Sequence, residues 1–322
     1  MSILLIVFTL IFTSIVIYYV GNIFAKASSN IGEYLRLSKS VKGATFDAIA
    51  SSMPELMVAL FSVIFFNSFE VGIGTIVGSA LFNLLIIPAL CVIVAPIAFK
   101  VKDEVVKRDS IFYMFTIFLL LSLVLLFKFW GILISVCLIF SYLIYIKLLI
   151  RDTKKHRKEK IVERKKINLF REVVIFIVCV IIMGIATYFL TEASINLSEI
   201  LGVHAIIIAF TVTAAATSVP DTVISVVNAR KGDLDDATSN VFGSNIFDIA
   251  IGLGLPLLIY TIGFGSVEII FEHIELLLML LGSSIYVLFV MSENNSLSRK
   301  QGASLLVIYL FIMIYVFYLA MF

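Results

Sequence analysis

Apolar residues along this chain gather into stretches of about twenty, and short polar connections separate one stretch from the next. A helix that crosses a bilayer needs about 20 mostly apolar residues, so each stretch predicts one membrane-spanning helix. We expect ten spans, at about residues 2–25, 41–66, 70–95, 110–127, 129–150, 171–193, 203–229, 235–261, 271–291 and 301–321. The pattern predicts an all-α polytopic membrane protein.

Composition supports this class. Of the 322 residues 61% are apolar and 14% are charged, whereas a soluble domain carries about 25% charged residues. The first apolar stretch has no basic residue before it, which favours a retained helix over a cleaved signal peptide. The cysteines and histidines are scattered and predict neither a disulfide framework nor an imidazole metal site, and we expect no cofactor: Cys91, Cys137, Cys179, His156, His204 and His273.

The basic residues predict an orientation. With both termini outside, every lysine and arginine except Lys128 falls on the cytoplasmic side, as the positive-inside rule requires. Residues 151–170 form a strongly basic connection, which we interpret as a cytoplasmic linker that touches anionic lipid rather than nucleic acid. The expected domains are residues 1–150, the linker 151–170, and residues 171–322, in a prokaryotic plasma membrane.

Two halves of the chain repeat one another. At an offset of 166 residues, "ATFDAIASSMPELMV" (44–58) matches "FTVTAAATSVPDTVI" (210–224) at Ser52 with Ser218, Pro54 with Pro220, and Glu55 with Asp221. Downstream, "VGSALFN" (77–83) matches "FGSNIFD" (242–248). The copies lie five spans apart, an odd number, so the second runs through the membrane in the opposite direction. Such inverted repeats place substrate sites near the midplane, where the halves meet.

Three carboxylic acids lie deep inside the apolar stretches. Each costs about 2.5–3.5 kcal/mol at the centre of a membrane helix, and residues that bear this cost are usually functional. Hydroxyl or amide side chains stand three or four positions away on the same helix faces. The candidate cation ligands are therefore Glu55, Asp221, Asp248, Ser51, Ser52, Thr217, Ser218, Ser79, Asn83 and Ser244. All are oxygen donors, which suit Ca²⁺ or Na⁺ rather than zinc or copper.

Pro54 and Pro220 predict a break in each of the two acid-bearing helices. Proline has no N–H and clashes with the carbonyl four residues back, so the break frees backbone carbonyls that need a partner in the membrane. A bound cation is one such partner. A proline-kinked bundle whose acids hydrogen-bond to serines is the structural alternative. Asp47, whose repeat counterpart is Thr213, either lines a cytoplasmic vestibule or reaches the inner face.

The motifs "ASSMPELMVALFS" with "GTIVGSALFN", and "ATSVPDTVISVVNARKGDLDDATSNVFGSNIFDIAIGLGLP", resemble the two α-repeats of the sodium/calcium exchangers, within the cation/calcium antiporter superfamily. The second is most similar to the potassium-dependent branch. The resemblance implies exchange of several Na⁺ for one Ca²⁺, with Glu55 and Asp221 as central ligands and backbone carbonyls contributed by Ala48 and Ala214. Ala50-Ser51, Asp221 and Asp248 depart from many members, which leaves K⁺ coupling and stoichiometry open.

Other functions fit parts of the pattern. In a Ca²⁺/H⁺ antiporter the same carboxylates would carry protons, although the glycine-asparagine of that branch is absent here. An intramembrane enzyme could use Ser52 or Ser218 as nucleophile, but neither motif contains a histidine or lysine base. A cation channel is a third alternative. The sequence gives no indication of the oligomeric state.

Overall fold

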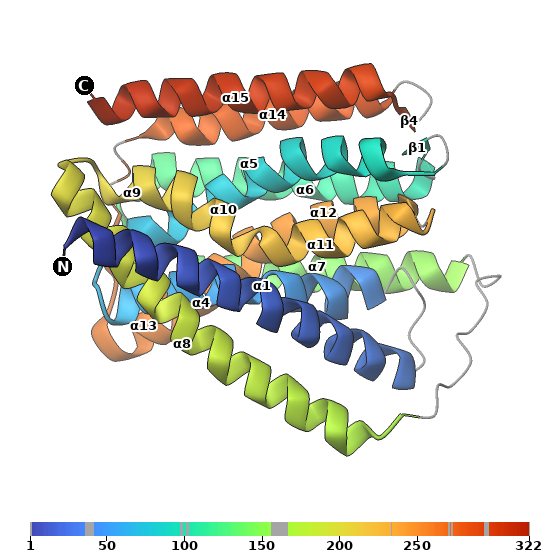
Figure 1. Cartoon of the computed structure of the whole chain (residues 1–322), viewed down its shortest axis with the longest axis horizontal. Coiled ribbons are helices and arrows are strands. Elements are labelled where there is room, and N and C mark those ends of the chain that lie inside the picture. Colours follow the sequence, from blue (N-terminus) through green and yellow to red (C-terminus); the bar gives the residue numbers. More distant parts are fainter. Residues whose placement is uncertain are drawn as a thin grey trace.

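The computed structural model describes residues 2–35, 42–96, 99–100, 103–155, 167–232, 234–269, 271, 273–292 and 296–321. Nearly all of them are helical (Figure 1). The first half contains α1 (Ile3–Tyr34), η1 (Gly43–Asp47), α3 (Ala48–Ser51), α4 (Met53–Ile64), α5 (Phe69–Val94), β1 (Phe99–Lys100), α6 (Asp103–Leu126), β2 (Phe129–Trp130) and α7 (Ile132–Lys155). Most of the predicted linker, residues 156–166, lies outside the described residues.

The second half repeats the order of the first, with two exceptions. Its elements are α8 (Leu169–Leu201), α9 (Ala205–Ile208), η2 (Ala209–Thr213), α10 (Ala214–Thr217), α11 (Val219–Arg230), α12 (Leu234–Phe247), η3 (Asp248–Gly252), α13 (Leu253–Phe264), β3 (Val267–Glu268), α14 (Ile274–Ser292), β4 (Ser296–Leu297) and α15 (Arg299–Met321). The exceptions are that α9 precedes the π-helical turn η2 and that η3 divides the counterpart of α5 into α12 and α13. The η elements are π-helical turns, which are rare and occur mostly inside α-helices at functional sites.

The all-α polytopic fold expected from the sequence is confirmed. Among the described residues, eight helices are long and apolar enough to cross a membrane. Two further segments pass as bent pairs, residues 45–64 with a bend of 51° and residues 205–230 with a bend of 43°. Counting each bent pair as one span gives the expected ten. Some predicted ends were too short, because α1 continues to Tyr34 and α8 to Leu201.

The second half is inverted relative to the first. Helix α4 begins at Met53 and its counterpart α11 at Val219, and the two run in opposite directions (Figure 1). The short strands obey the same relation: β1 pairs with β4 at one end of the bundle, and β2 pairs with β3 at the other. Each ladder therefore joins one half of the chain to the other. Both chain termini lie at the end that carries β2 and β3 (Figure 1).

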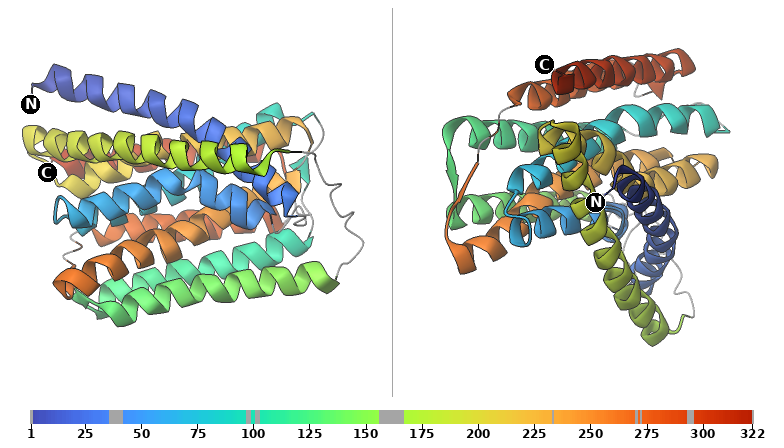
Figure 2. Two further views of the ribbon diagram at one scale, coloured as in Figure 1. Left: turned by 90° about the horizontal axis from the view of Figure 1, so that it is seen from below. Right: turned by 60° about the vertical axis from the view of Figure 1, so that its left-hand side comes forward.

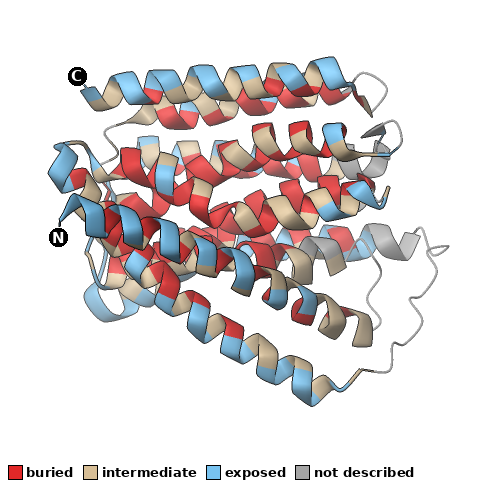
Figure 3. Cartoon of the chain, viewed as in Figure 1, coloured by how far each residue is buried: buried red, intermediate tan, exposed pale blue. Residues whose placement is uncertain are grey.

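Helix α5 forms the centre of the bundle. In an apolar stretch of 18 residues, 78% of the residues of α5 are buried, against 11% for α15. Helix α5 packs on α4, α11, α12, α14 and α15. Helices α1 and α8 pack on each other at the outside, where each buries one stripe and exposes the other face (Figures 2 and 3). In a helix bundle within lipid, such exposed apolar faces are the expected contact surface for acyl chains.

Candidate functional site

The two bent spans bring their breaks to the middle of the bundle. Pro54 and Pro220 occupy the first turns of α4 and α11, just after the breaks at Ser52 and Ser218. Glu55 and Asp221 follow immediately, also in the first turn of each helix. The N-terminus of a helix carries partial positive charge and unpaired N–H groups, so it stabilises a carboxylate placed there. The proline break thus makes a local environment for each buried acid.

The Glu55 carboxylate is linked to both halves of the chain. Its Oε1 accepts a hydrogen bond from Ser79 Oγ at 3.1 Å, and Ser79 Oγ in turn accepts one from Ser218 Oγ at 2.9 Å. All three side chains are fully buried. Helices α4 and α5 of the first half and the break in the second half therefore meet at Glu55.

The Asp221 carboxylate makes the equivalent connection from the second half. Ser244 Oγ donates to Oδ1 at 2.7 Å, and Asn83 Nδ2 donates to Oδ2 at 2.8 Å. The hydroxyls of Ser51 and Ser244 lie 3.2 Å apart, so the cluster continues back to the break in the first half. Thr217 reaches toward Glu55 from the end of α10. The structure therefore brings the predicted residues of both repeats into one polar cluster.

Asp248 completes the group of buried acids, but its setting differs from that of its repeat counterpart. It opens the π-helical turn η3, whereas Asn83 lies within the regular helix α5. Its carboxyl group lies within electrostatic range of Glu55 and Asp221. A π-helical turn adds one residue to the turn of an α-helix, so the side chains of that turn point in other directions than in a regular helix. The two repeats are therefore unequal at this position.

Several buried oxygen atoms of the cluster have no hydrogen-bond partner among the described residues. They are Glu55 Oε2, both oxygens of Asp248, Ser52 Oγ, Asn83 Oδ1 and Asn240 Oδ1. Leaving a buried polar atom unpaired costs about 1–3 kcal/mol, and more when the group is charged. All of these atoms can act as acceptors, as the ligands of a cation must. Carboxylate, amide and hydroxyl oxygens are the ligands that hard cations such as Ca²⁺ prefer.

The cluster is not a conventional metal centre built from several acids or imidazoles at one point. No group of three His, Cys, Asp or Glu side chains that could hold a metal is present in the described part of the chain. Neutral hydroxyls and amides separate the three carboxylates instead.

The backbone carbonyls of Ala48 and Ala214 are already engaged. The Ala48 oxygen accepts from Ser52 N at 3.0 Å and from Ser51 Oγ at 3.1 Å. The Ala214 oxygen accepts from Ser218 N at 3.0 Å and from Thr217 Oγ1 at 3.2 Å. Two hydrogen bonds use both lone pairs of a carbonyl oxygen. Their role as cation ligands stays a prediction, and it requires the neighbouring hydroxyls to turn away.

Sequence reasoning missed two amide side chains of the cluster. Asn245 donates from Nδ2 to the Ala80 carbonyl at 3.1 Å and accepts from Asn83 Nδ2 at 3.1 Å, while Asn240 donates to Ser225 Oγ at 3.0 Å. The repeat counterpart of Asn245 is Ala80, so a comparison that seeks paired polar residues overlooks it. The available signal was an amide side chain within the apolar run "NVFGSNIF".

Glycine brings the central helix close to the broken one. A Cβ added at Gly78 of α5 would fall on the carbonyl oxygen of Phe210 and would lie 2.8 Å from the Cβ of Ala214. No side chain fits between α5 and the η2–α10 segment at this point. Small residues that allow such close approach are common at helix contacts in membranes. This contact places Ser79 beside Ser218.

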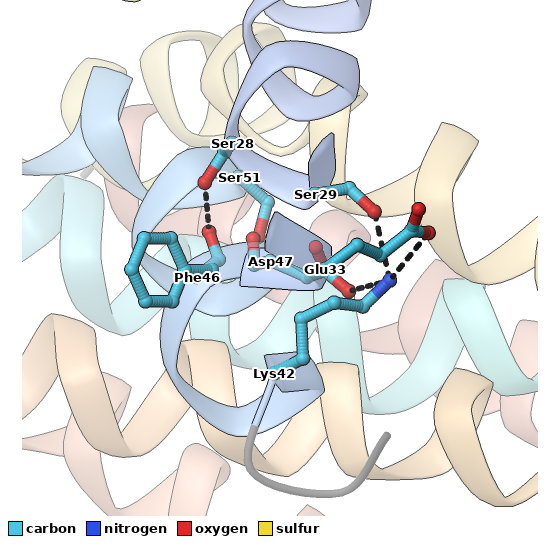
Figure 4. Close-up of polar contacts among 7 residues, drawn as sticks. All are labelled: Ser28, Ser29, Glu33, Lys42, Phe46, Asp47 and Ser51. Carbon is cyan, nitrogen blue, oxygen red and sulfur yellow. Dashed lines mark hydrogen bonds and ion pairs between the residues drawn. The ribbon is translucent and has the colours of Figure 1, made fainter. Parts of the chain in front are cut away.

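A second polar network ties α1 to the first broken span (Figure 4). Lys42 Nζ donates to Ser29 Oγ at 2.7 Å and lies 3.9 Å from a carboxylate oxygen of Glu33 and 3.7 Å from one of Asp47. Ser28 Oγ donates to the Phe46 carbonyl at 2.8 Å. Asp47, which the sequence left open, is therefore half-buried and paired with Lys42. Its carbonyl also accepts from Ser51 Oγ at 3.0 Å, which connects the network to the cluster.

This fold and site define a polytopic membrane protein with an oxygen-rich, charged cluster buried between two inverted halves. The sequence model of the sodium/calcium exchanger protein family matches residues 5–151 and 171–318, and the chain belongs to that family. It is therefore an integral membrane protein and a cation/Ca²⁺ antiporter. The family consists of transporters, and the resemblance seen in the two repeat motifs is confirmed.

Relatives of the chain come from bacteria, archaea and animals. The chain is 28% identical over 277 residues to the inner membrane protein YrbG of Escherichia coli, with 82% of each protein covered. It is 23% identical to an uncharacterized membrane protein of Methanocaldococcus jannaschii, over 92% of this chain and 93% of that protein. It is 39% identical over 125 residues to the human sodium/potassium/calcium exchanger 3, which covers 38% of this chain and 19% of the human protein.

A solved structure has the same fold. The sodium-calcium exchanger NCX_Mj, soaked with Na⁺ and Sr²⁺, matches with a TM-score of 0.67 at 22% identity, over 96% of this chain and 98% of that one. At this identity the match establishes the arrangement of helices. The ions that this chain moves must be argued from its own residues.

Proposed function

We propose that this chain exchanges Na⁺ for Ca²⁺ by alternating access, with the cluster around Glu55 and Asp221 as the shared binding site. One observation carries the proposal. The two acids occupy equivalent helix breaks in inverted halves and are fully buried, and buried acceptor oxygens around them lack partners in the described structure. A bound cation would pair with these oxygens and neutralise the acids at the same time, whereas a proton would neutralise one carboxylate only.

The proposed ligand set follows from the cluster. Glu55 and Asp221 are central, and Ca²⁺ and Na⁺ compete for them. The supporting ligands are Ser51, Ser52, Thr217, Ser218, Ser79, Asn83, Ser244 and Asp248, with the carbonyls of Ala48 and Ala214. Closing the site off from water while its acids are charged and unpaired is costly. The loaded site closes and changes its facing, whereas the empty site does not, and this difference makes the protein an antiporter rather than a channel.

The outer pair of helices is the proposed moving part. Helices α1 and α8 contact the broken spans but contribute none of the proposed ligands. Gly21 lets α1 pass directly over the kink, since a Cβ there would lie 2.7 Å from Pro220 Cγ. Sliding of α1 and α8 over a fixed core would open one side of the cluster and cover the other, as expected for inverted repeats around a central site.

The remaining features of the proposal concern topology. We place both termini outside and the basic connection 151–170 in the cytoplasm of a prokaryotic cell, in contact with anionic lipid. Residues 1–150 and 171–322 are the two five-helix repeats. The shared location of both termini at one end of the bundle, opposite the ends of α7 and α8 that flank the connection, supports this arrangement (Figure 1).

Uptake of ⁴⁵Ca²⁺ into proteoliposomes under separate Na⁺, K⁺ and H⁺ gradients tests the proposal. We expect an outward Na⁺ gradient at fixed pH to drive uptake, and Glu55→Gln and Asp221→Asn to abolish it. Glu199→Gln, at the exposed end of α8, is the matched control and should transport normally. Uptake driven by an H⁺ gradient alone would instead make the chain a Ca²⁺/H⁺ antiporter. If Ca²⁺ uptake also requires K⁺ on the side of the membrane opposite the Na⁺, the chain couples K⁺ to the exchange.

A further inference from the structure

The fold brings together two histidines that lie far apart in the sequence. His204 caps the start of α9, and His273 precedes α14. The centroids of the two imidazole rings are 5.2 Å apart and the ring planes are inclined at 75°. The starts of α9 and α14, which these residues adjoin, lie at the end of the bundle that carries the chain termini (Figure 1). The imidazole pair was not predictable from the sequence, because tertiary structure alone creates it.

His273 is held in a fixed orientation by a carboxylate. Its Nδ1 lies 2.9 Å from Oε1 of Glu275. An ionised carboxylate only accepts, so Nδ1 carries the hydrogen and the neutral ring keeps its lone pair on Nε2. That Nε2 atom is buried and has no hydrogen-bond partner among the residues described. A histidine that donates one ring N–H to a carboxylate and offers the other nitrogen is the usual form of a metal-bound histidine.

The separation of the rings suits a single ion. Two nitrogens bound to one tetrahedral Zn²⁺ at about 2.0–2.1 Å lie roughly 3.3 Å apart. The ring centroids are 5.2 Å apart, and rotation of the exposed His204 side chain would bring one of its nitrogens to that separation while Glu275 keeps His273 in place. His204 is exposed, so the ion has access from solvent on this side of the bundle.

We infer that His204 and His273 form a binding site for a transition-metal dication such as Zn²⁺ or Cu²⁺, with Glu275 as a positioning residue. Imidazole nitrogen selects these ions over Ca²⁺, which prefers oxygen. No third His, Cys, Asp or Glu completes a ligand set within the described ranges. The bound ion joins the start of α9, which leads through η2 and α10 to Ser218, to the start of α14.

Isothermal titration of Zn²⁺ into the purified full-length protein tests the site, with saturating Ca²⁺ present to occupy the oxygen cluster. We expect one Zn²⁺ to bind per chain. His204→Gln and His273→Gln should each weaken binding at least tenfold, whereas His204→Cys should restore it, because a thiolate is also a zinc ligand. Glu275→Gln should weaken binding by about 10–100-fold or less, the usual effect of losing an orienting carboxylate.

His156→Gln is the matched control, since it removes the remaining histidine of the chain. The inference is overturned if the double variant His204→Gln/His273→Gln binds Zn²⁺ as the wild type does, or if His156→Gln removes binding. A rise in the thermal unfolding midpoint on adding Zn²⁺, present in the wild type and absent in the double variant, is the second measurement. Both measurements report binding and do not depend on whether the chain exchanges Na⁺ for Ca²⁺.

Discussion

Asn83 donates from Nδ2 to Oδ2 of Asp221 at 2.8 Å, so an amide of the first repeat directly supports the central acid of the second. The repeat counterpart of Asn83 is the acid Asp248. A fully symmetric site would carry either two amides or two acids at these positions. The chain carries one of each, and the amide gives Asp221 a donor where an acid would give it a repelling charge.

Asn83→Asp should impair transport more than loss of the side chain does. The substitution adds a second negative charge beside Asp221, and two carboxylates this close cannot both stay charged without a cation between them. We expect Na⁺-driven ⁴⁵Ca²⁺ uptake at neutral pH to fall at least tenfold, and Asn83→Ala to cause a smaller decrease. Asn168→Asp, at the exposed N-cap of α8 where aspartate caps as well as asparagine, is the control. Unchanged uptake across Ca²⁺ concentrations in Asn83→Asp would contradict a supporting role for the amide.

Gly78→Ala should destabilise the protein, whereas Gly282→Ala should not. At Gly78 the added methyl group collides with the Phe210 carbonyl, and forcing an extra methyl group into a packed site costs about 1–3 kcal/mol or more. At Gly282, within α14, the added Cβ has no heavy atom within 4 Å outside its own helix, and helix propensity favours alanine by about 0.5–1 kcal/mol. Thermal unfolding in detergent measures both. Equal midpoints for the two variants would show that α5 and η2 are not in close contact.

The features that follow from local chemistry were predictable. Pro54 and Pro220 fix the two helix breaks through the missing N–H, and the matching positions of Glu55 and Asp221 follow from the repeat. The ends of helices were harder to predict where a helix continues beyond the apolar part of its sequence. Helix α8 runs past the expected residue 193 and stops at Gly202, which adopts φ 67°. A glycine in this left-handed conformation is a common helix stop, so the signal was present in the sequence.

Contacts made only by tertiary structure were not predictable. Asn245 has no polar counterpart in the first repeat, and the pairing of His204 with His273 depends on how the ends of α9 and α14 meet. The π-helical turns at Gly43–Asp47 and Ala209–Thr213 occupy equivalent positions in the two halves, but no residue pattern marked them. A single extra residue per turn changes helical periodicity too little to be recognised in a uniformly apolar segment.

Lys42→Met should loosen the attachment of α1 to the first broken span. The substitution keeps the aliphatic stem, which packs against Gly32, and removes the charge that lies between Glu33 and Asp47. These ion pairs are long and partly exposed, so we expect unfolding stability to fall by no more than about 1 kcal/mol. The rate of Na⁺/Ca²⁺ exchange should change more than the free energy of unfolding does, because α1 is the proposed moving helix. Wild-type exchange rates in Lys42→Met would show that this network does not restrain α1.

Cysteines introduced at the two ends of the bundle should react with a thiol reagent from opposite sides of the membrane. Lys128 lies beside β2 at the end that carries both termini, and its side chain is 67% exposed. Ser298 follows β4 at the other end and is also exposed (Figure 1). If the excess of basic residues marks the cytoplasm, Lys128→Cys faces the outside and Ser298→Cys faces the inside.

A membrane-impermeant maleimide applied to intact cells checks this orientation, in a background where Cys91, Cys137 and Cys179 are replaced by serine or alanine. We expect Lys128→Cys to react at once, and Ser298→Cys to react only after the cells are permeabilised. The reverse pattern would place the termini and the two histidines in the cytoplasm. Labelling of both positions in intact cells would mean that β2 and β4 share one side, which an inverted pair of five-helix halves does not allow, because a ten-span chain places the two ladders at opposite ends.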